Sequence, residues 1–136
     1  MNKAIFDFMS NDPFARSLGM SITSVEEGFA KLSMTVDDSM VNFHGAMHGG
    51  VIFALADSAF ALASNSYGSV AVGINVSMNF IKAAMPGDKL IAEASEVSKN
   101  FKLGIYQMKV KNESGDLIAT AEGMVYRKKD KFGELV

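Results

Sequence analysis

The sequence predicts an α+β fold in which an antiparallel β-sheet wraps around one long central helix. Residues 49–66 carry apolar side chains at helical spacing around most of the circumference, as in a helix that is buried on several sides. Two strand-like segments precede this helix and four follow it, with turn residues between them. Because no strand alternates with a helix as in a βαβ unit, we expect the strands to pair antiparallel.

The N-terminal segment, residues 1–18, is predicted to be helical. Residues 2–9 have an amphipathic pattern. Asn11-Asp12-Pro13 is typical of a turn or cap, and a second short helix over residues 12–18 is expected to follow.

Apolar residues at every second position predict the strands. The first two lie near residues 22–25 and 30–36, and Glu26-Glu27-Gly28 between them predicts a hairpin. After the long helix, four strands are expected to follow one another as a meander, at residues 70–84, 89–97, 101–111 and 117–126. The last residues, 127–136, are expected to form a charged tail.

Composition limits the possible functions. The 136 residues suit one domain, 1–136, and 49% hydrophobic residues suffice for a core. The formal net charge of −2 argues against a nucleic-acid partner bound through a broad basic surface. The absence of cysteine excludes disulfides and thiolate chemistry. No apolar run approaches the roughly 18 residues that span a membrane, so a cytoplasmic protein without membrane contacts is expected.

Asp57 is a lone carboxylate in the apolar helical segment ALADSAFALA. Desolvation in such surroundings would raise the pKa of its carboxyl group, and burying the charge would cost stability. A position with this cost often has a functional reason. From the chemistry alone, a structural Asp bonded to Ser58 or to backbone amides is equally consistent.

His48-Gly49-Gly50 stands at the start of the same helix. A helix N-terminus presents unpaired N–H groups and the positive end of the helix dipole, and Gly49 would let another group approach them. The segment is therefore a candidate oxyanion site, and a tight turn that requires glycine is the alternative interpretation.

The loop before the helix concentrates polar groups, including both histidines of the chain, His44 and His48. Asn42 is suited either to hold a substrate carbonyl or a water, or to form a turn. Two histidines without further placed ligands are a weak indication of a metal, and no metal site is predicted.

The spacing of Gly49 and Asp57 predicts a dimer. Eight residues rise about 12 Å along a helix. An oxyanion donor and a catalytic base must both lie within about 3 Å of one reacting group, so these two residues cannot serve one site in one subunit. Two antiparallel helices across a twofold axis would bring Gly49 of one copy beside Asp57 of the other, which predicts an obligate homodimer with interfacial sites.

The stretch NFHGAMHGGVIFALADSAFALASNSYG, residues 42–68, resembles the signature of the PaaI-like thioesterases of phenylacetic acid degradation, within the hotdog superfamily. The matching elements are Asn42, His44-Gly45, His48-Gly49-Gly50, Leu55-Ala56-Asp57, Ala59-Phe60, Asn65-Ser66 and Gly68, followed downstream by Gly87-Asp88-Lys89-Leu90-Ile91-Ala92, Gly123 and Tyr126. The resemblance covers roughly residues 12–127. One departure is Lys82-Ala83, where the family commonly has Arg-Pro; lysine keeps the charge but not the planar fork of arginine.

This resemblance implies a hotdog-fold enzyme that hydrolyses aryl- or medium-chain acyl-CoA thioesters without a metal or redox cofactor. The carboxylate matching Asp57 attacks the thioester or activates water, and the N–H group matching Gly49 stabilises the oxyanion. Residues matching Asn42 and His48 shape the site, which lies at a dimer interface, and the dimers usually pair into a homotetramer. The residues expected to contact the substrate are Gly50, Phe53, Phe60, Ala61, Ser64, Met47 and Lys82.

Two other functions remain open from the sequence. A hotdog dehydratase or hydratase would pair a histidine with an acid, for which His48 and Asp57 are candidates, but the order of the motifs favours the thioesterase. A non-catalytic acyl-CoA-binding or regulatory module on the same fold is the second alternative, because a fold does not determine a function. The carboxylate at position 57 argues against a mere binder.

Overall fold

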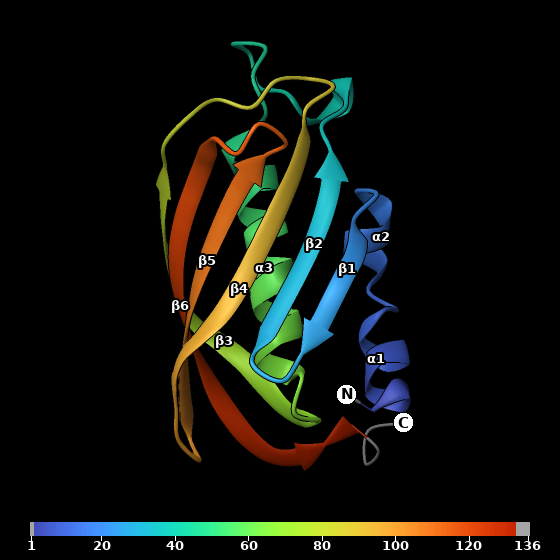
Figure 1. Ribbon diagram of the computed structural model, residues 1–136, viewed down its shortest axis with the longest axis vertical. Coiled ribbons are helices and arrows are strands. Elements are labelled where there is room, and N and C mark those ends of the chain that lie inside the picture. Colours follow the sequence, from blue (N-terminus) through green and yellow to red (C-terminus); the bar gives the residue numbers. More distant parts are fainter. Residues whose placement is uncertain (1, 133–136) are drawn as a thin grey trace.

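The computed structural model describes residues 2–132, and there it forms one six-stranded antiparallel sheet curved around a long helix (Figure 1). The predicted α+β fold class is confirmed. The strand order is β1-β2-β4-β5-β6-β3. In chain order the elements are α1 (Lys3–Met9), α2 (Pro13–Ser17), β1 (Ser21–Glu26), β2 (Phe29–Thr35), the 3-10 turn η1 (Asp38–Met40), α3 (Gly49–Asn65), β3 (Ser69–Phe80), β4 (Lys89–Lys99), β5 (Leu103–Asn112) and β6 (Leu117–Lys131).

The sheet order corrects one prediction. The β1–β2 hairpin is confirmed, and β4, β5 and β6 do form a meander. β3 was expected beside β4 but pairs with β6, with Phe80 opposite Ala119, and thus forms an edge of the sheet. The connection from β3 to β4 crosses the end of the sheet, where Ala84 accepts a hydrogen bond from Met47 N–H at 2.8 Å. Alternation is a local signal that predicts a strand without indicating its neighbour.

The last strand is longer than predicted. Residues 127–131, expected as part of a charged tail, continue β6, and Lys131 pairs with Ser69 of β3. Phe132 is buried and stacks on the Phe8 ring with 5.0 Å between centroids. The tail prediction is therefore wrong up to Phe132, because exposed charged side chains do not prevent their backbone from pairing. The final four residues of the predicted tail lie outside the described part of the chain.

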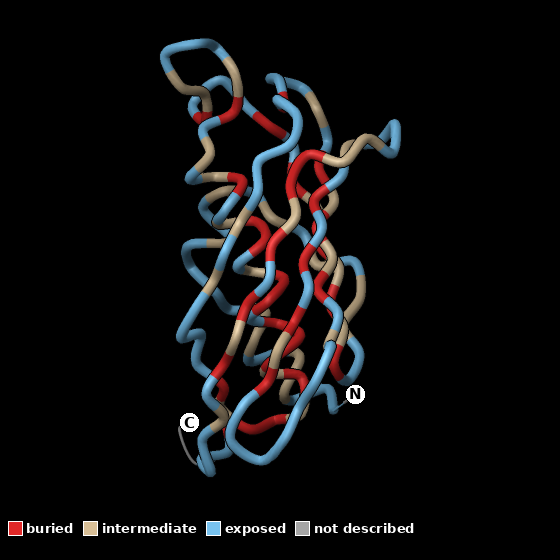
Figure 2. The backbone as a smooth tube through the Cα atoms, turned by 90° about the vertical axis from the view of Figure 1, so that its left-hand side faces the viewer, coloured by how far each residue is buried: buried red, intermediate tan, exposed pale blue. Residues whose placement is uncertain are grey.

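The core lies between the concave face of the sheet and one face of α3, as the buried central strands in Figure 2 show. α3 contributes the buried residues Ile52, Leu55, Ala56, Ala59, Phe60, Leu62, Ala63 and Ser64. Small alanines let the helix approach the sheet closely, and the Phe60 ring meets the edge of the Tyr106 ring at 5.9 Å. In the described part of the chain, no helix has the length and apolar character needed to cross a membrane.

Asn65 and Ser66 hold the end of α3 in place. The Asn65 side chain accepts a hydrogen bond from Ala71 N–H at 2.9 Å and donates one to Ala71 O at 3.1 Å. Ser66 Oγ accepts a hydrogen bond from Gly28 N–H at 2.9 Å. Gly68 has φ +85°, a conformation that favours glycine. Asn65, Ser66 and Gly68 of the family signature therefore have a structural role: they join α3 to β3 and to the β1–β2 turn.

Gly123→Ala is expected to destabilise the fold because its Cβ would lie 2.7 Å from Phe60 Cζ. Overpacking of a core costs about 1–3 kcal/mol in free energy of unfolding. Gly73→Ala is the matched control, since its Cβ would lie 3.2 Å from the same ring and require a smaller shift. Urea unfolding measures both variants, and an equal or greater loss in Gly73→Ala would contradict this account of the packing.

Candidate functional site

One face of α3 is not covered by the sheet of its own chain. Gly50, Phe53, Asp57 and Ala61 recur at helical spacing along this face, and all four are exposed. The prediction that Asp57 is buried in apolar surroundings is therefore wrong for the single chain. Its neighbours along this face include Ala61, with a single methyl group, and Gly50, which has no side chain, so neither covers the carboxyl group.

The pKa of the Asp57 carboxyl group is raised above its usual value. The larger cause is desolvation by the surrounding protein atoms, which exclude some water from this exposed side chain, and the negative charge of Asp12 contributes further. A carboxylate with a raised pKa is a stronger base, which suits a residue that activates water or attacks a carbonyl carbon.

The start of α3 presents an unpaired N–H group. His48 is the N-cap residue, and its Nδ1 accepts a hydrogen bond from Gly50 N–H at 2.8 Å. His48 O accepts hydrogen bonds from the next two N–H groups, of Val51 at 3.0 Å and Ile52 at 3.3 Å. Gly49 N–H has no acceptor among residues 2–132. It lies at the positive end of the helix dipole and is available to a developing negative charge.

The capping bond of His48 also determines where its proton lies. Since Nδ1 accepts a hydrogen bond, the neutral imidazole carries its proton on Nε2. The exposed ring can therefore donate a hydrogen bond to a ligand that sits at the helix start.

Asn42 forms a turn in the loop before α3. Its Oδ1 accepts hydrogen bonds from His44 N–H at 2.9 Å and from Ala46 N–H at 3.3 Å. The turn places Phe43 and His44 at the exposed tip of the loop, with their rings in contact at 4.2 Å. No group of three His, Cys, Asp or Glu side chains among the described residues is arranged to hold a metal ion.

Three of the residues expected to contact the substrate lie elsewhere in the single chain. Met47, Phe60 and Ser64 are buried, at 3%, 2% and 2% exposed, and fill the core of their own chain. In the single chain they are covered by other residues, and their contact with the substrate stays a prediction. Helical spacing alone could not separate them from that face, because Ser64, seven residues after Asp57, falls on the same side of the helix and Phe60 lies at its edge. Their burial depends on which other elements cover them.

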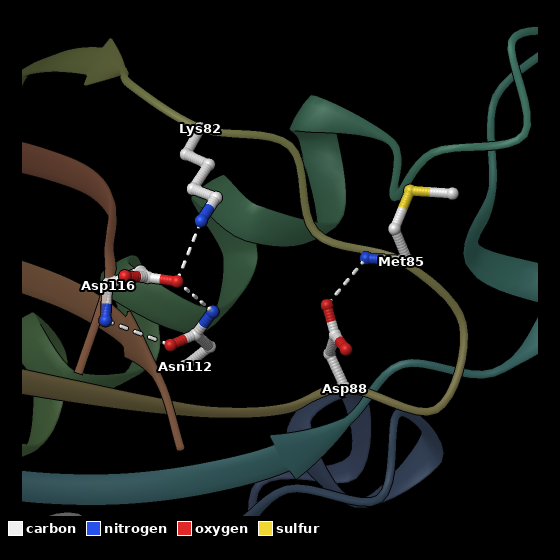
Figure 3. Close-up of polar contacts among 5 residues, drawn as sticks. All are labelled: Lys82, Met85, Asp88, Asn112 and Asp116. Atoms are coloured by element: carbon white, nitrogen blue, oxygen red, sulfur yellow. Dashed lines mark hydrogen bonds and ion pairs between the residues drawn. The ribbon is translucent and has the colours of Figure 1, made fainter. Parts of the chain in front are cut away.

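Lys82, another residue expected to contact the substrate, lies on the crossover between β3 and β4. Its Nζ forms an ion pair with Asp116 at 2.7 Å, and Asp116 also accepts a hydrogen bond from Asn112 at 3.2 Å (Figure 3). Hydrogen bonds from Lys82 and Asn112 lower the pKa of the Asp116 carboxyl group. On the same crossover, Asp88 accepts a hydrogen bond from Met85 N–H at 2.9 Å, which closes the turn before β4.

A second polar cluster lies at the C-terminal end of α3. The hydroxyl groups of Tyr67 and Tyr106 both donate to Glu96 Oε1, at 2.8 and 3.2 Å. Desolvation and this carboxylate raise the pKa of Tyr67 to about 12 and that of Tyr106 further, so both hydroxyl groups stay protonated. The cluster joins the helix end to β4 and β5 and serves the fold.

A pocket of about 980 Å³ lies beside the open face of α3, and sequence reasoning missed it. Its walls come from most of the N-terminal residues between Phe8 and Ile22, from Ser58, Ala61, Leu62 and Asn65 of α3, and from Leu32, Val70 and Phe132. Asn11-Asp12-Pro13 lies in the wall of this pocket, but in the sequence it indicates only a turn or helix cap. That interpretation is confirmed, because Asp12 Oδ1 accepts a hydrogen bond from Ala15 N–H at 3.1 Å.

Known proteins resemble this chain over most of its length. The family model "Thioesterase superfamily" matches residues 44–119. An Archaeoglobus fulgidus protein named "Putative esterase" is 46% identical over 133 residues, 97% of this chain and 86% of that protein. The Escherichia coli acyl-coenzyme A thioesterase PaaI is 38% identical over 117 residues, 86% of this chain and 84% of that protein.

Two solved structures share the fold. The structure of E. coli PaaI, from the phenylacetic acid degradation operon, superposes with a TM-score of 0.90 at 36% identity and covers 93% of this chain and 91% of that one. A Streptococcus mutans protein solved with bound acetyl-CoA has a TM-score of 0.79 at 28% identity, over 82% of this chain and 90% of that one.

Proposed function

Since this chain belongs to the PaaI-like thioesterases of the hotdog fold and is an acyl-CoA thioesterase, we propose that each of its reaction centres is built by two copies of the chain. The observation that carries the proposal is the placement of Gly49 and Asp57 on one helix. Eight residues of α3 separate the unpaired N–H group from the carboxylate by about 12 Å of helix rise. A second α3 that runs antiparallel to the first removes this separation.

The proposed reaction converts an acyl-CoA thioester and water into a carboxylic acid and CoA. Asp57 of one copy either removes a proton from the water that attacks the carbonyl carbon, or attacks this carbon itself to form a mixed anhydride that water then hydrolyses. In both cases the C–S bond breaks, and the sulfur leaves as thiolate and takes up a proton to become CoA thiol. Gly49 N–H of the other copy donates to the carbonyl oxygen as its negative charge develops. His48, the N-cap residue of that same helix start, is proposed to orient the thioester through its Nε2–H.

Strand β3 supports the proposed dimer. It forms one edge of the sheet, and it exposes large apolar side chains there, including Val72 at 43%, Ile74 at 54% and Phe80 at 58%. An unprotected edge strand with apolar side chains is a template for pairing with another chain. Pairing two copies through β3 would cover these side chains.

The proposal also covers the substrate class, the contact with CoA and the assembly of the dimers. The substrates are aryl- or medium-chain acyl-CoA thioesters, and phenylacetyl-CoA is the first aryl candidate because the E. coli relative comes from a phenylacetic acid degradation operon. Lys82 is proposed to meet a CoA phosphate, and two dimers to pair into a tetramer. Light scattering measures the mass in solution, and an active monomer would overturn the shared site.

Mixing two inactive variants is expected to restore activity. Asp57→Asn and Gly49→Pro each damage both sites of a homodimer, but a mixed dimer holds one site with both native residues. After random exchange of subunits, about a quarter of the native sites return. Thiol release from acyl-CoA before and after refolding the mixture measures this. A mixture of Asp57→Asn with Asp57→Ala, treated in the same way, is the control, because none of its dimers holds a native site. If the first mixture recovers no more activity than this control, the shared site is contradicted.

A further inference from the structure

The aromatic ring of Phe80 lies beside the start of α3. β3 ends at Phe80 at the same end of the molecule where α3 begins with Gly49 (Figure 1). Apart from the helix itself, the atoms nearest to a Cβ added at Gly49 all belong to this ring: Cε1 at 3.3 Å, Cζ at 3.4 Å and Cδ1 at 3.9 Å. Because glycine has no Cβ, the ring can lie close to the backbone of the residue whose N–H group is unpaired.

The sheet holds the base of the Phe80 side chain in place. Phe80 is opposite Ala119 in the ladder between β3 and β6. Directly after it, the N–H groups of Ile81 and Lys82 both donate to Ile118 O, at 2.8 and 3.2 Å. The backbone that carries the ring is therefore fixed by the sheet, and not by the loop that precedes α3.

The two glycines at the helix start have different neighbours. A Cβ added at Gly50 would lie 3.0 Å from Nδ1 of the His48 ring, whereas Gly49 has the Phe80 ring beside it. The helix start therefore has one polar neighbour, which is the proposed donor to the thioester, and one apolar neighbour. The article's site so far assigns a role to the first of these only.

The exposure of Phe80 connects the ring to the proposed dimer. In the single chain 58% of Phe80 is exposed, although most of a large aromatic side chain is usually buried. Pairing of two copies through β3 would cover the exposed part. The ring would then lie between the two copies, at the edge of the site where the Gly49 N–H group meets the thioester.

An apolar ring suits this position for two reasons. It offers no strong hydrogen-bond acceptor, so it leaves the Gly49 N–H group free, whereas a polar side chain could pair with that group. It also takes the place of water molecules that would otherwise compete for the N–H group and weaken its interaction with a developing charge. An oxyanion donor stabilises the transition state most in surroundings that exclude water.

We propose that Phe80 is a positioning residue for the reaction, which acts through Gly49 by excluding water from its N–H group. The inference rests on the proposed function and deepens it. Since the hydrogen bond to the oxyanion strengthens in the transition state, loss of the ring lowers kcat and leaves KM nearly unchanged.

The first test replaces the ring in the full-length protein. Phe80→Ala is expected to lower kcat for thiol release about tenfold, less than removal of the donor itself, and to change KM less than about threefold. Phe80→Leu keeps an apolar group beside Gly49 and should retain at least about one-third of the native kcat. Phe101→Ala is the control, because Phe101 is 79% exposed and lies between β4 and β5, and it should keep the native kcat.

The second test separates this role from a contribution of Phe80 to the dimer or to the fold. In the Gly49→Pro background the N–H group is absent, so adding Phe80→Ala is expected to lower kcat less than about twofold further. A weaker dimer or a damaged fold would lower kcat by the same factor in both backgrounds. Light scattering reports the mass of each variant in the assay.

The possible failures are distinguishable. If no acyl-CoA releases thiol, the proposed function fails, and if Gly49→Pro keeps the native kcat, the proposed oxyanion donor fails. If Gly49→Pro loses activity but Phe80→Ala keeps the native kcat, the inference about Phe80 alone is overturned. An equal loss from Phe80→Ala in both backgrounds, or a loss in Phe80→Leu as large as in Phe80→Ala, would overturn it as well.

Discussion

Asp57→Asn is expected to lower kcat for acyl-CoA hydrolysis by about 10²–10⁴-fold, the usual contribution of a catalytic acid–base or nucleophilic group. The amide has nearly the same shape as the carboxylate but can neither take a proton from water nor attack the thioester. Because the side chain is exposed on α3, the fold does not depend on its charge. Thiol release measured with saturating substrate reports kcat, and circular dichroism reports the fold.

Asp130→Asn is the matched control, because Asp130 is also exposed and lies on β6, outside α3. It should retain the native rate. A kcat for Asp57→Asn above about one-tenth of the native value would rule out the assigned role.

The pH dependence follows from the raised pKa of Asp57. Catalysis requires the ionised carboxylate, so kcat/KM falls as the pH drops through this pKa, at a higher pH than for an unperturbed aspartate. Asp12→Asn removes a nearby negative charge, which makes ionisation of Asp57 easier. The acid limb of the profile is therefore expected to shift to lower pH in that variant while asparagine preserves the helix cap. A shift in the other direction would contradict the electrostatic account.

Gly49→Pro is expected to reduce kcat by about 10²–10³-fold, because proline lacks the N–H group proposed to stabilise the oxyanion. The helix itself should tolerate the change. Gly49 occupies the first position of α3, where proline is favoured, and the preceding His48 already has φ −61° and ψ 133°, the conformation preferred before proline. The effect should appear in kcat more than in KM, since the bond strengthens in the transition state.

Gly49→Ala is the control for the added carbon atoms. Its Cβ would lie 3.3 Å from Phe80 Cε1, which requires only a small shift of a half-exposed ring. It keeps the N–H group and should lose far less activity than the proline variant. Equal losses in the two variants would show that space at Phe80, and not the N–H group, determines the effect.

The sequence by itself determined the parts of this protein that depend on local pattern. Helical spacing predicted α3 from Gly49 onwards, and alternation predicted six strands near their observed places. The helix start and Asp57 can be predicted as a site because each depends on a few neighbouring residues. A carboxylate in an apolar helical segment is costly, and a glycine at a helix start leaves the N–H groups accessible. The separation along one helix that predicts a dimer also follows from the sequence, since helix rise is constant.

Only the tertiary structure decided the features that depend on contacts between segments far apart in the sequence. It placed β3 beside β6, extended β6 through Lys131 and turned Phe60 into the core. It also formed the pocket, whose walls are brought together from α1, α2 and α3. The physical reason is that periodicity describes which side of an element is apolar, whereas burial depends on which other element comes to cover that side.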